Sequence, residues 1–122
     1  MYTLYIDSYF WAGHSVPLQD GSAEPVHNHN FCATAKLTSH VLNDKAMVMD
    51  FCDLRQLLDS ITAGIAQAGN IGRIDYFTKK GQTAEIIAQY IFERLKTVLP
   101  DSIVLAEVTV TEQPQCRAAY SQ

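Results

Sequence analysis

The sequence predicts an α+β fold, in which an antiparallel sheet carries two helices segregated to one face. Residues 2–11 and 27–42 alternate apolar and polar side chains with the period of a strand. From residue 50 the apolar residues recur with a helical period, and they do so again from about residue 82. Two further alternating stretches close the chain, so the predicted order is β-β-α-α-β-β.

The first two strands are predicted to be joined by a loop. Tyr2, Leu4 and Ile6 share one face of the first strand, and aromatic and β-branched residues dominate it. Residues 17–25 are rich in Gly, Pro, Asp and Ser, which is typical of a connection between antiparallel strands. One face of the second strand is expected to carry His27, His29, Phe31, Ala33, Ala35 and Leu37.

The two helices each show one apolar stripe. The first has Asp50 as its N-cap and a stripe of Phe51, Leu54, Leu57, Leu58, Ile61 and Ile65, with Phe51 in the core. Glycines then open a loop that runs to about Gly81. The second helix starts at residue 82 or 83 and ends before Pro100, with a stripe of Ile86, Ile87, Tyr90, Ile91 and Leu95. Strands are expected over 103–111, with a bulge at 106–107, and over 116–120.

Length and composition exclude several classes of protein. We expect residues 1–122 to form one domain, because 122 residues suffice for a core without disulfides or structural metals. With a net charge of −4, no long basic run and no long apolar run, the chain offers no nucleic-acid or membrane surface. It begins without a leader pattern, and its 3 cysteines lack CxxC spacing, so a cytoplasmic protein without disulfides is expected.

Three of the 4 histidines lie within a short N-terminal window. His27 and His29 are two residues apart on a strand, so their side chains point to the same face. With His14 they would offer three imidazole ligands and leave a fourth position open, as catalytic zinc sites do. The alternative is a chance H-x-H pair that decorates a solvated strand end.

Five motifs, taken in order, resemble those of the 6-pyruvoyl-tetrahydropterin synthase family, which includes the 6-carboxy-tetrahydropterin synthases of queuosine biosynthesis. The motifs are F-W-A-G-H (10–14), H-N-H-N-F (27–31), M-V-M-D-F-C-D-L (47–54), Q-T-A-E-x-x-A-x-Y-I (82–91) and V-T-V-T-E-x-x-x-x-x-A-x-Y (108–120). The resemblance runs from about residue 4 to 120. It implies the tunnelling fold (T-fold), with trimers that close a barrel, hexamers of two trimers, and active sites at subunit interfaces.

The resemblance also implies roles for individual residues. His14, His27 and His29 match the family's zinc ligands, and Glu112 matches the carboxylate that binds the pterin ring. A carboxylate accepts two parallel N–H bonds from a 2-amino-4-oxo pyrimidine edge, although a solvated acid at a strand end is the competing interpretation of Glu112. Thr83 and Glu85 match substrate neighbours of the family, and a helix-capping role is favoured for them.

The chain departs from the family's pattern at the catalytic positions. Ala23 stands where the family has its cysteine, and the adjacent Glu24 is a candidate base, with an exposed loop acid as the alternative. The family's Asp-His pair falls near residues 66–67, where no histidine exists, and the glycine of H-G-H is Asn28. None of the cysteines is a good replacement: Cys32 has the wrong strand parity, and Cys52 and Cys116 lie elsewhere.

Two functions therefore remain open. The first is a zinc-dependent carbon–oxygen lyase acting on a dihydroneopterin-triphosphate-like pterin, with Glu24, a metal-bound hydroxide or a residue of a neighbouring subunit as base. The second is a divergent protein that binds a pterin or purine with a metal, or that cleaves the pterin side chain instead. A metal-free aldolase or epimerase of the same fold is disfavoured, because it would not need the three histidines.

Overall fold

The first two strands form one long antiparallel hairpin in the computed structural model, which describes residues 1–122. Strand β1 (Tyr2–His14) pairs with β2 (His27–Ser39) without a break, from Tyr2 opposite Ser39 to His14 opposite His27. The first strand thus continues three residues beyond the predicted Trp11, and the second ends three residues before the predicted Leu42. The hairpin register places two of the predicted metal ligands directly opposite each other.

Two shorter strands complete a four-stranded antiparallel sheet with the order β1-β2-β3-β4. They are β3 (Val104–Gln113) and β4 (Cys116–Tyr120). The predicted bulge is confirmed, because Lys36 pairs with Glu107 while Leu37 pairs with Leu105. A second irregularity, between Thr111 and Gln113, marks the end of the β3–β4 pairing.

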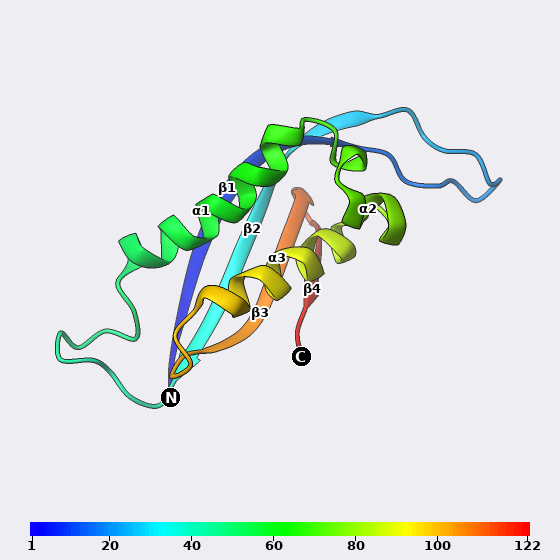
Figure 1. Cartoon of the computed structure of the whole chain (residues 1–122). Helices are drawn as coiled ribbons and strands as arrows, with labels where there is room; N and C mark the ends of the chain where they lie inside the picture. The colour runs from blue at the N-terminus through cyan, green and yellow to red at the C-terminus, as the bar shows by residue number, and fades with distance from the viewer.

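Two long helices cover one face of this sheet, which confirms the predicted α+β class (Figure 1). They are α1 (Phe51–Ala68), which lies along β1, and α3 (Ala84–Val98), which lies along β3 and β4. Between them, where a loop was expected, stand a 3₁₀ turn η1 (Ile71–Arg73) and a short helix α2 (Asp75–Lys80). No helix is both long and apolar enough to cross a membrane.

The core lies between the sheet and the two long helices. The predicted inner face of β2 is confirmed, since Phe31, Ala33, Ala35 and Leu37 are all fully buried. Phe51 was wrongly expected there: it is 56% exposed. It is the first residue of α1, and it lines an end pocket with Leu4 instead of packing into the core.

Candidate metal centre

Four side chains from three strands meet at one end of the sheet. His14 ends β1, His27 and His29 begin β2, and Glu112 lies near the end of β3. One potential ligand atom from each of the four residues lies within 4.8 Å of all the others. The Nε2 atoms of His14 and His27 are 3.1 Å apart, so the predicted convergence of the histidines is present.

Hydrogen bonds to the ring nitrogens that face away from the cluster fix the orientation of the His14 and His27 imidazoles. The Nδ1 atom of His14 lies 2.8 Å from the carbonyl oxygen of Gln82, and Nδ1 of His27 lies 3.0 Å from that of Pro25. A carbonyl only accepts, so each Nδ1 carries the proton, and a neutral ring then has a lone pair on Nε2. Both lone pairs point into the cluster, which is how metal-bound histidines are oriented.

This arrangement fits a metal ion better than a set of internal hydrogen bonds. With their protons on Nδ1, neutral His14 and His27 have no hydrogen to place between their Nε2 atoms. The Nε2 atom of His29 is buried and has no hydrogen-bond partner. Nitrogens bound to a tetrahedral zinc at about 2.0–2.1 Å lie about 3.3 Å apart, close to the spacing seen here.

The protonation of His29 also favours metal binding. Burial lowers the pKa of the His29 imidazole, and the nearby Glu112 carboxylate opposes this shift without reversing it. A lowered pKa keeps the ring neutral at pH 7, and the neutral ring is the form that binds a metal.

Glu24 lies behind His27 and not among the inward-facing atoms. Its Oε1 atom accepts a hydrogen bond from the Val16 N–H at 3.1 Å and lies 3.6 Å from Nδ1 of His27. The Glu24 N–H in turn donates to the Val16 carbonyl at 3.1 Å, so the loop holds this residue from both sides. The carboxylate is therefore placed to act on the outer nitrogen of a ligand, and its side chain is 24% exposed.

Gln82 connects the start of α3 to the cluster, and no sequence motif predicted this contact. Besides its carbonyl contact to His14, its Oε1 atom accepts a 3.0 Å hydrogen bond from the Ser15 N–H. Thr83 is the N-cap of α3 and accepts from the Ile86 N–H at 3.3 Å, as the favoured capping interpretation required. Glu85 is an exposed acid in the first turn of α3 and makes no hydrogen bond or ion pair with the cluster.

Asn28 is accommodated by a glycine on the neighbouring strand. Asn28 pairs with Gly13, and a Cβ added to Gly13 would lie 2.8 Å from the Asn28 Oδ1 atom. In this pair the small residue therefore stands on β1 and the larger one on β2.

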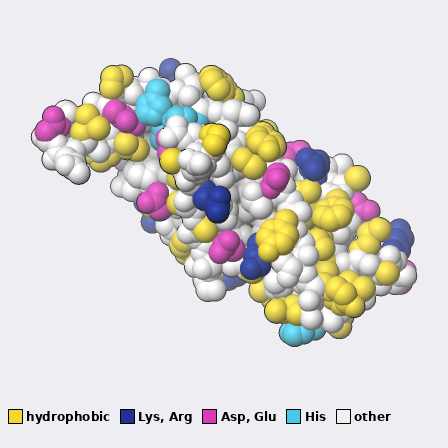
Figure 2. Space-filling view, turned by 180° about the vertical axis from the view of Figure 1, so that it is seen from behind, with side chains coloured by type: hydrophobic (Ala, Val, Ile, Leu, Met, Phe, Trp, Pro, Cys, Tyr) yellow, Lys and Arg dark blue, Asp and Glu magenta, His cyan; other side chains and the backbone are white.

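The remaining candidate side chains stay away from the cluster. Cys32 contacts Thr34 on the outer face of the sheet, and burial raises the pKa of its thiol. Cys52 and Cys116 are exposed, at the start of α1 and in β4. His40 follows the opposite end of β2 and is exposed. Figure 2 shows histidine side chains gathered near one end of the molecule with acidic side chains beside them.

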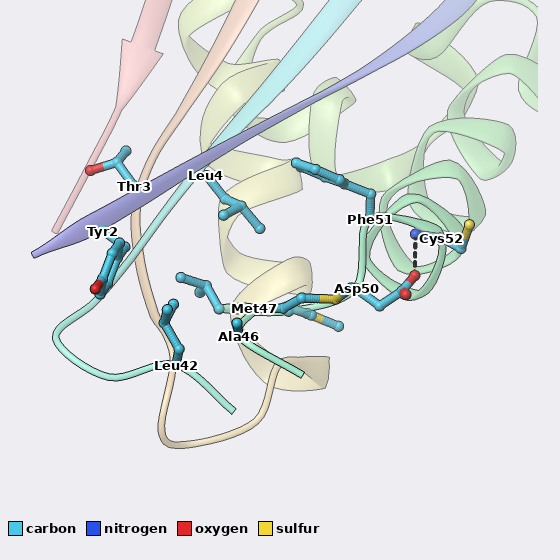
Figure 3. A pocket seen from close by; sticks show the side chains of 11 residues that line it. Tyr2, Thr3, Leu4, Leu42, Ala46, Met47, Asp50, Phe51 and Cys52 are labelled. Atoms are coloured by element: carbon cyan, nitrogen blue, oxygen red, sulfur yellow. Dashed lines mark hydrogen bonds between the residues drawn. The ribbon is translucent and has the colours of Figure 1, made fainter. Parts of the chain in front are cut away.

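A cavity of about 510 Å³ lies at the other end of the sheet (Figure 3). Its lining is mostly apolar and includes Leu4, Leu42, Met47 and Phe51. The Asp50 carboxylate, its one charged group, accepts a 2.7 Å hydrogen bond from the Cys52 N–H as the N-cap of α1. Without converging polar groups, this cavity is a weaker candidate for a reaction site than the histidine cluster.

Sequence comparison matches residues 3–122 to the model of the 6-pyruvoyl tetrahydropterin synthase family. A Caenorhabditis elegans protein provisionally named as a 6-pyruvoyl tetrahydrobiopterin synthase is 29% identical over 73% of this chain and 64% of its own length. The 6-pyruvoyl tetrahydrobiopterin synthase of Drosophila melanogaster is 22% identical over 77% of this chain and 56% of its own. The matches thus span less than two thirds of these relatives.

Solved structures show the same fold. The C. elegans 6-pyruvoyl tetrahydropterin synthase superposes with a TM-score of 0.86 at 25% identity, covering 99% of this chain and 95% of that one. The Plasmodium falciparum protein of this name gives 0.75 at 17% identity, with coverages of 99% and 97%. A Plasmodium vivax protein of this name, in which a catalytic glutamate is changed to alanine, gives 0.73 at 17% identity, with the same coverages. These likenesses confirm the T-fold.

Proposed function

The chain belongs to the 6-pyruvoyl tetrahydropterin synthase family, and on that premise we propose that it is a zinc-dependent pterin synthase. It would act as a carbon–oxygen lyase on a dihydroneopterin-triphosphate-like substrate. The observation that supports this most strongly is the convergence of three imidazoles and one carboxylate within 4.8 Å of one another.

His14, His27 and His29 are the proposed zinc ligands, through their Nε2 atoms. Zinc would supply Lewis acidity, which acidifies the hydroxyls of a bound side chain and polarises the carbonyl that develops from them. The outer hydrogen bonds to Gln82 and Pro25 would keep two of these rings oriented toward it.

Glu112 is the proposed anchor for the pterin ring. Its side chain is 28% exposed, so its carboxylate can accept N–H bonds from an arriving heterocycle. Thr83 and Glu85 are proposed as neighbours of that substrate, because the Gln82 contact holds the start of α3 against His14. Thr83 also caps α3, and Glu85 lies in the first turn of that helix.

Glu24 is the proposed base. Glu24 lies beside the cluster, because its Oε1 atom is 3.6 Å from Nδ1 of His27. The Plasmodium vivax relative, whose catalytic residue is a glutamate, provides a precedent for a carboxylate in this role. A base must take protons from the substrate side chain, which the exposed part of Glu24 would do from beside His27.

The proposed assembly is a trimer, or a hexamer of two trimers, in the cytoplasm. In this sheet β1 and β4 are edge strands, and β1 offers 13 residues along its free edge. Unpaired strand edges favour pairing with another chain. Closure of three sheets into a barrel would satisfy both edges at once.

The alternative proposal is a divergent family member that binds a pterin or purine without the standard turnover, or that cleaves its side chain. The observation in its favour is that no thiol lies at the cluster and that no histidine follows His40 in the chain. Glu24 would then only orient His27 through the 3.6 Å contact to its Nδ1 atom.

One experiment separates the two proposals. The zinc content and the turnover of dihydroneopterin triphosphate are measured for the wild type and for Glu24→Ala, with Asp101→Ala, which removes an exposed acid before β3, as the control. The synthase proposal predicts stoichiometric zinc in all three proteins and loss of turnover only in Glu24→Ala. Zinc without turnover in the wild type favours the divergent binding protein, and a wild type that binds no zinc contradicts both.

A further inference from the structure

Glu112 reaches further into the cluster than a substrate anchor requires. Its Oε1 atom lies 3.0 Å from Nε2 of His14 and 2.9 Å from Nε2 of His29. One oxygen is therefore nearly equidistant from two nitrogens that are proposed metal ligands. These separations resemble those between two ligand atoms on one tetrahedral ion, which are about 3.3 Å apart for zinc.

Neither short contact is a satisfactory hydrogen bond in the neutral cluster. The His14 Nδ1 proton is donated to the Gln82 carbonyl, so a neutral His14 offers Glu112 only a lone pair. The His29 contact leaves its buried Nε2 without a hydrogen-bond partner. The anionic Glu112 oxygen beside the His14 lone pair is repelled unless a cation lies between them.

The backbone explains why this carboxylate points inward. Glu112 lies between Thr111, which pairs with Arg117, and Gln113, which pairs with Cys116, so the ladder is irregular at this residue. Glu112 keeps the parity of Val108 and Val110, which are buried on the inner face.

We propose that Glu112 is a fourth metal ligand when no substrate is bound, so that three histidines and one carboxylate close the site. Any oxygen ligand, including the substrate's hydroxyls, must then displace the Glu112 carboxylate before it can reach the metal. The 28% exposed side chain leaves room for that movement. This inference rests on the metal site of the proposed function and adds an exchangeable ligand to it.

The test uses the Co²⁺-substituted protein, whose visible absorption reports the metal's coordination, and azide as the probe ligand. Glu112→Ala should open a coordination position, so azide should change its cobalt spectrum at concentrations that leave the wild type unchanged. Zinc affinity, measured by competition with a chromophoric chelator, should fall at least tenfold. Loss of even an outer-shell partner of a metal ligand typically costs 10–100-fold.

The controls separate this inference from the site on which it rests. Glu107→Ala removes an acid from the same strand on the outer face, and it should match the wild type. Glu112→Gln keeps the size of the side chain and replaces Glu112→Ala in the test if that variant folds poorly. It should bind azide at the concentrations expected for Glu112→Ala. Equal azide binding and equal zinc affinity in wild type and both Glu112 variants would overturn the fourth-ligand role. A wild type that binds neither cobalt nor zinc would overturn the metal site itself.

Discussion

Tyr76 is a residue whose ionisation the fold changes strongly. Burial raises its pKa to about 12, and the hydrogen bond that its hydroxyl donates to Glu93 at 3.1 Å adds to the shift. The neutral phenol is thus favoured in the folded state. Its stabilising contribution is fully present below pH 10, the usual value, and is lost as the pH rises toward 12.

We therefore expect one tyrosine to ionise about two pH units above an ordinary phenol, and Tyr76→Phe to abolish that step. The measurement is the tyrosinate absorbance of wild type and variant as the pH is raised. The control, Tyr5→Phe, removes an exposed tyrosine of β1 and should keep the late step. A late step that survives in Tyr76→Phe would contradict the assignment.

Gly13 and Asn28 form a pair in which one small residue makes room for a larger one. Gly13→Ala would bring its Cβ within 2.8 Å of Asn28 Oδ1 and 3.2 Å of the Val26 side chain. We expect it to lower the free energy of unfolding by about 1–3 kcal/mol, the usual cost of overpacking. Adding Asn28→Gly should recover part of this loss in urea unfolding, whereas strictly additive effects would show that the two residues do not compete for space.

The strand alternation was sufficient to predict that His27 and His29 face the same way, and the hairpin register then brought His14 to them. It was not sufficient to predict the contact of Gln82 with His14, because 68 residues separate the two. The strand parity that Glu112 shares with Val108 and Val110 predicts its inward direction, but not its contacts with His14 and His29. Local spacing predicts which side chains share a face, but not which distant backbone groups orient them.

At the scale of elements, the start of α3 has a structural role that can be separated from a role in substrate binding. Thr83 caps α3 through its hydroxyl oxygen. We expect Thr83→Ala to lower the free energy of unfolding by about 1 kcal/mol, while Thr83→Ser keeps most of it. Urea unfolding of the three proteins checks this, and zinc content should stay the same in all of them. Unchanged stability in Thr83→Ala would mean that the cap contributes nothing.

The long elements were predictable because each buries a regular stripe over many residues. The short ones were not: η1 and α2 span 3 and 6 residues, too few for a period to show. Phe51 matched the apolar stripe of α1. It is the first residue of that helix, however, and a side chain at a helix end can extend beyond the sheet that buries the later stripe residues. A stripe therefore predicts the middle of a helix better than its ends.

At the scale of the whole molecule, the proposed assembly has a spectroscopic marker. Trp11 is the only tryptophan and is 62% exposed in the single chain, on the edge strand β1. If β1 and β4 pair between chains, we expect a trimeric or hexameric mass by light scattering. We also expect the Trp11 emission to shift to longer wavelength as dilution separates the subunits. A monomeric mass with dilution-independent emission would contradict the assembly.

The metal centre is tested most directly by a crystal structure of the zinc-loaded protein with diffraction data on both sides of the zinc absorption edge. We predict one anomalous peak at about 2.0–2.1 Å from the Nε2 atoms of His14, His27 and His29. The same map shows whether Glu112 is bound to that metal. A zinc-loaded crystal without a peak among the three histidines, or with its zinc elsewhere, would contradict the metal site and the function proposed from it.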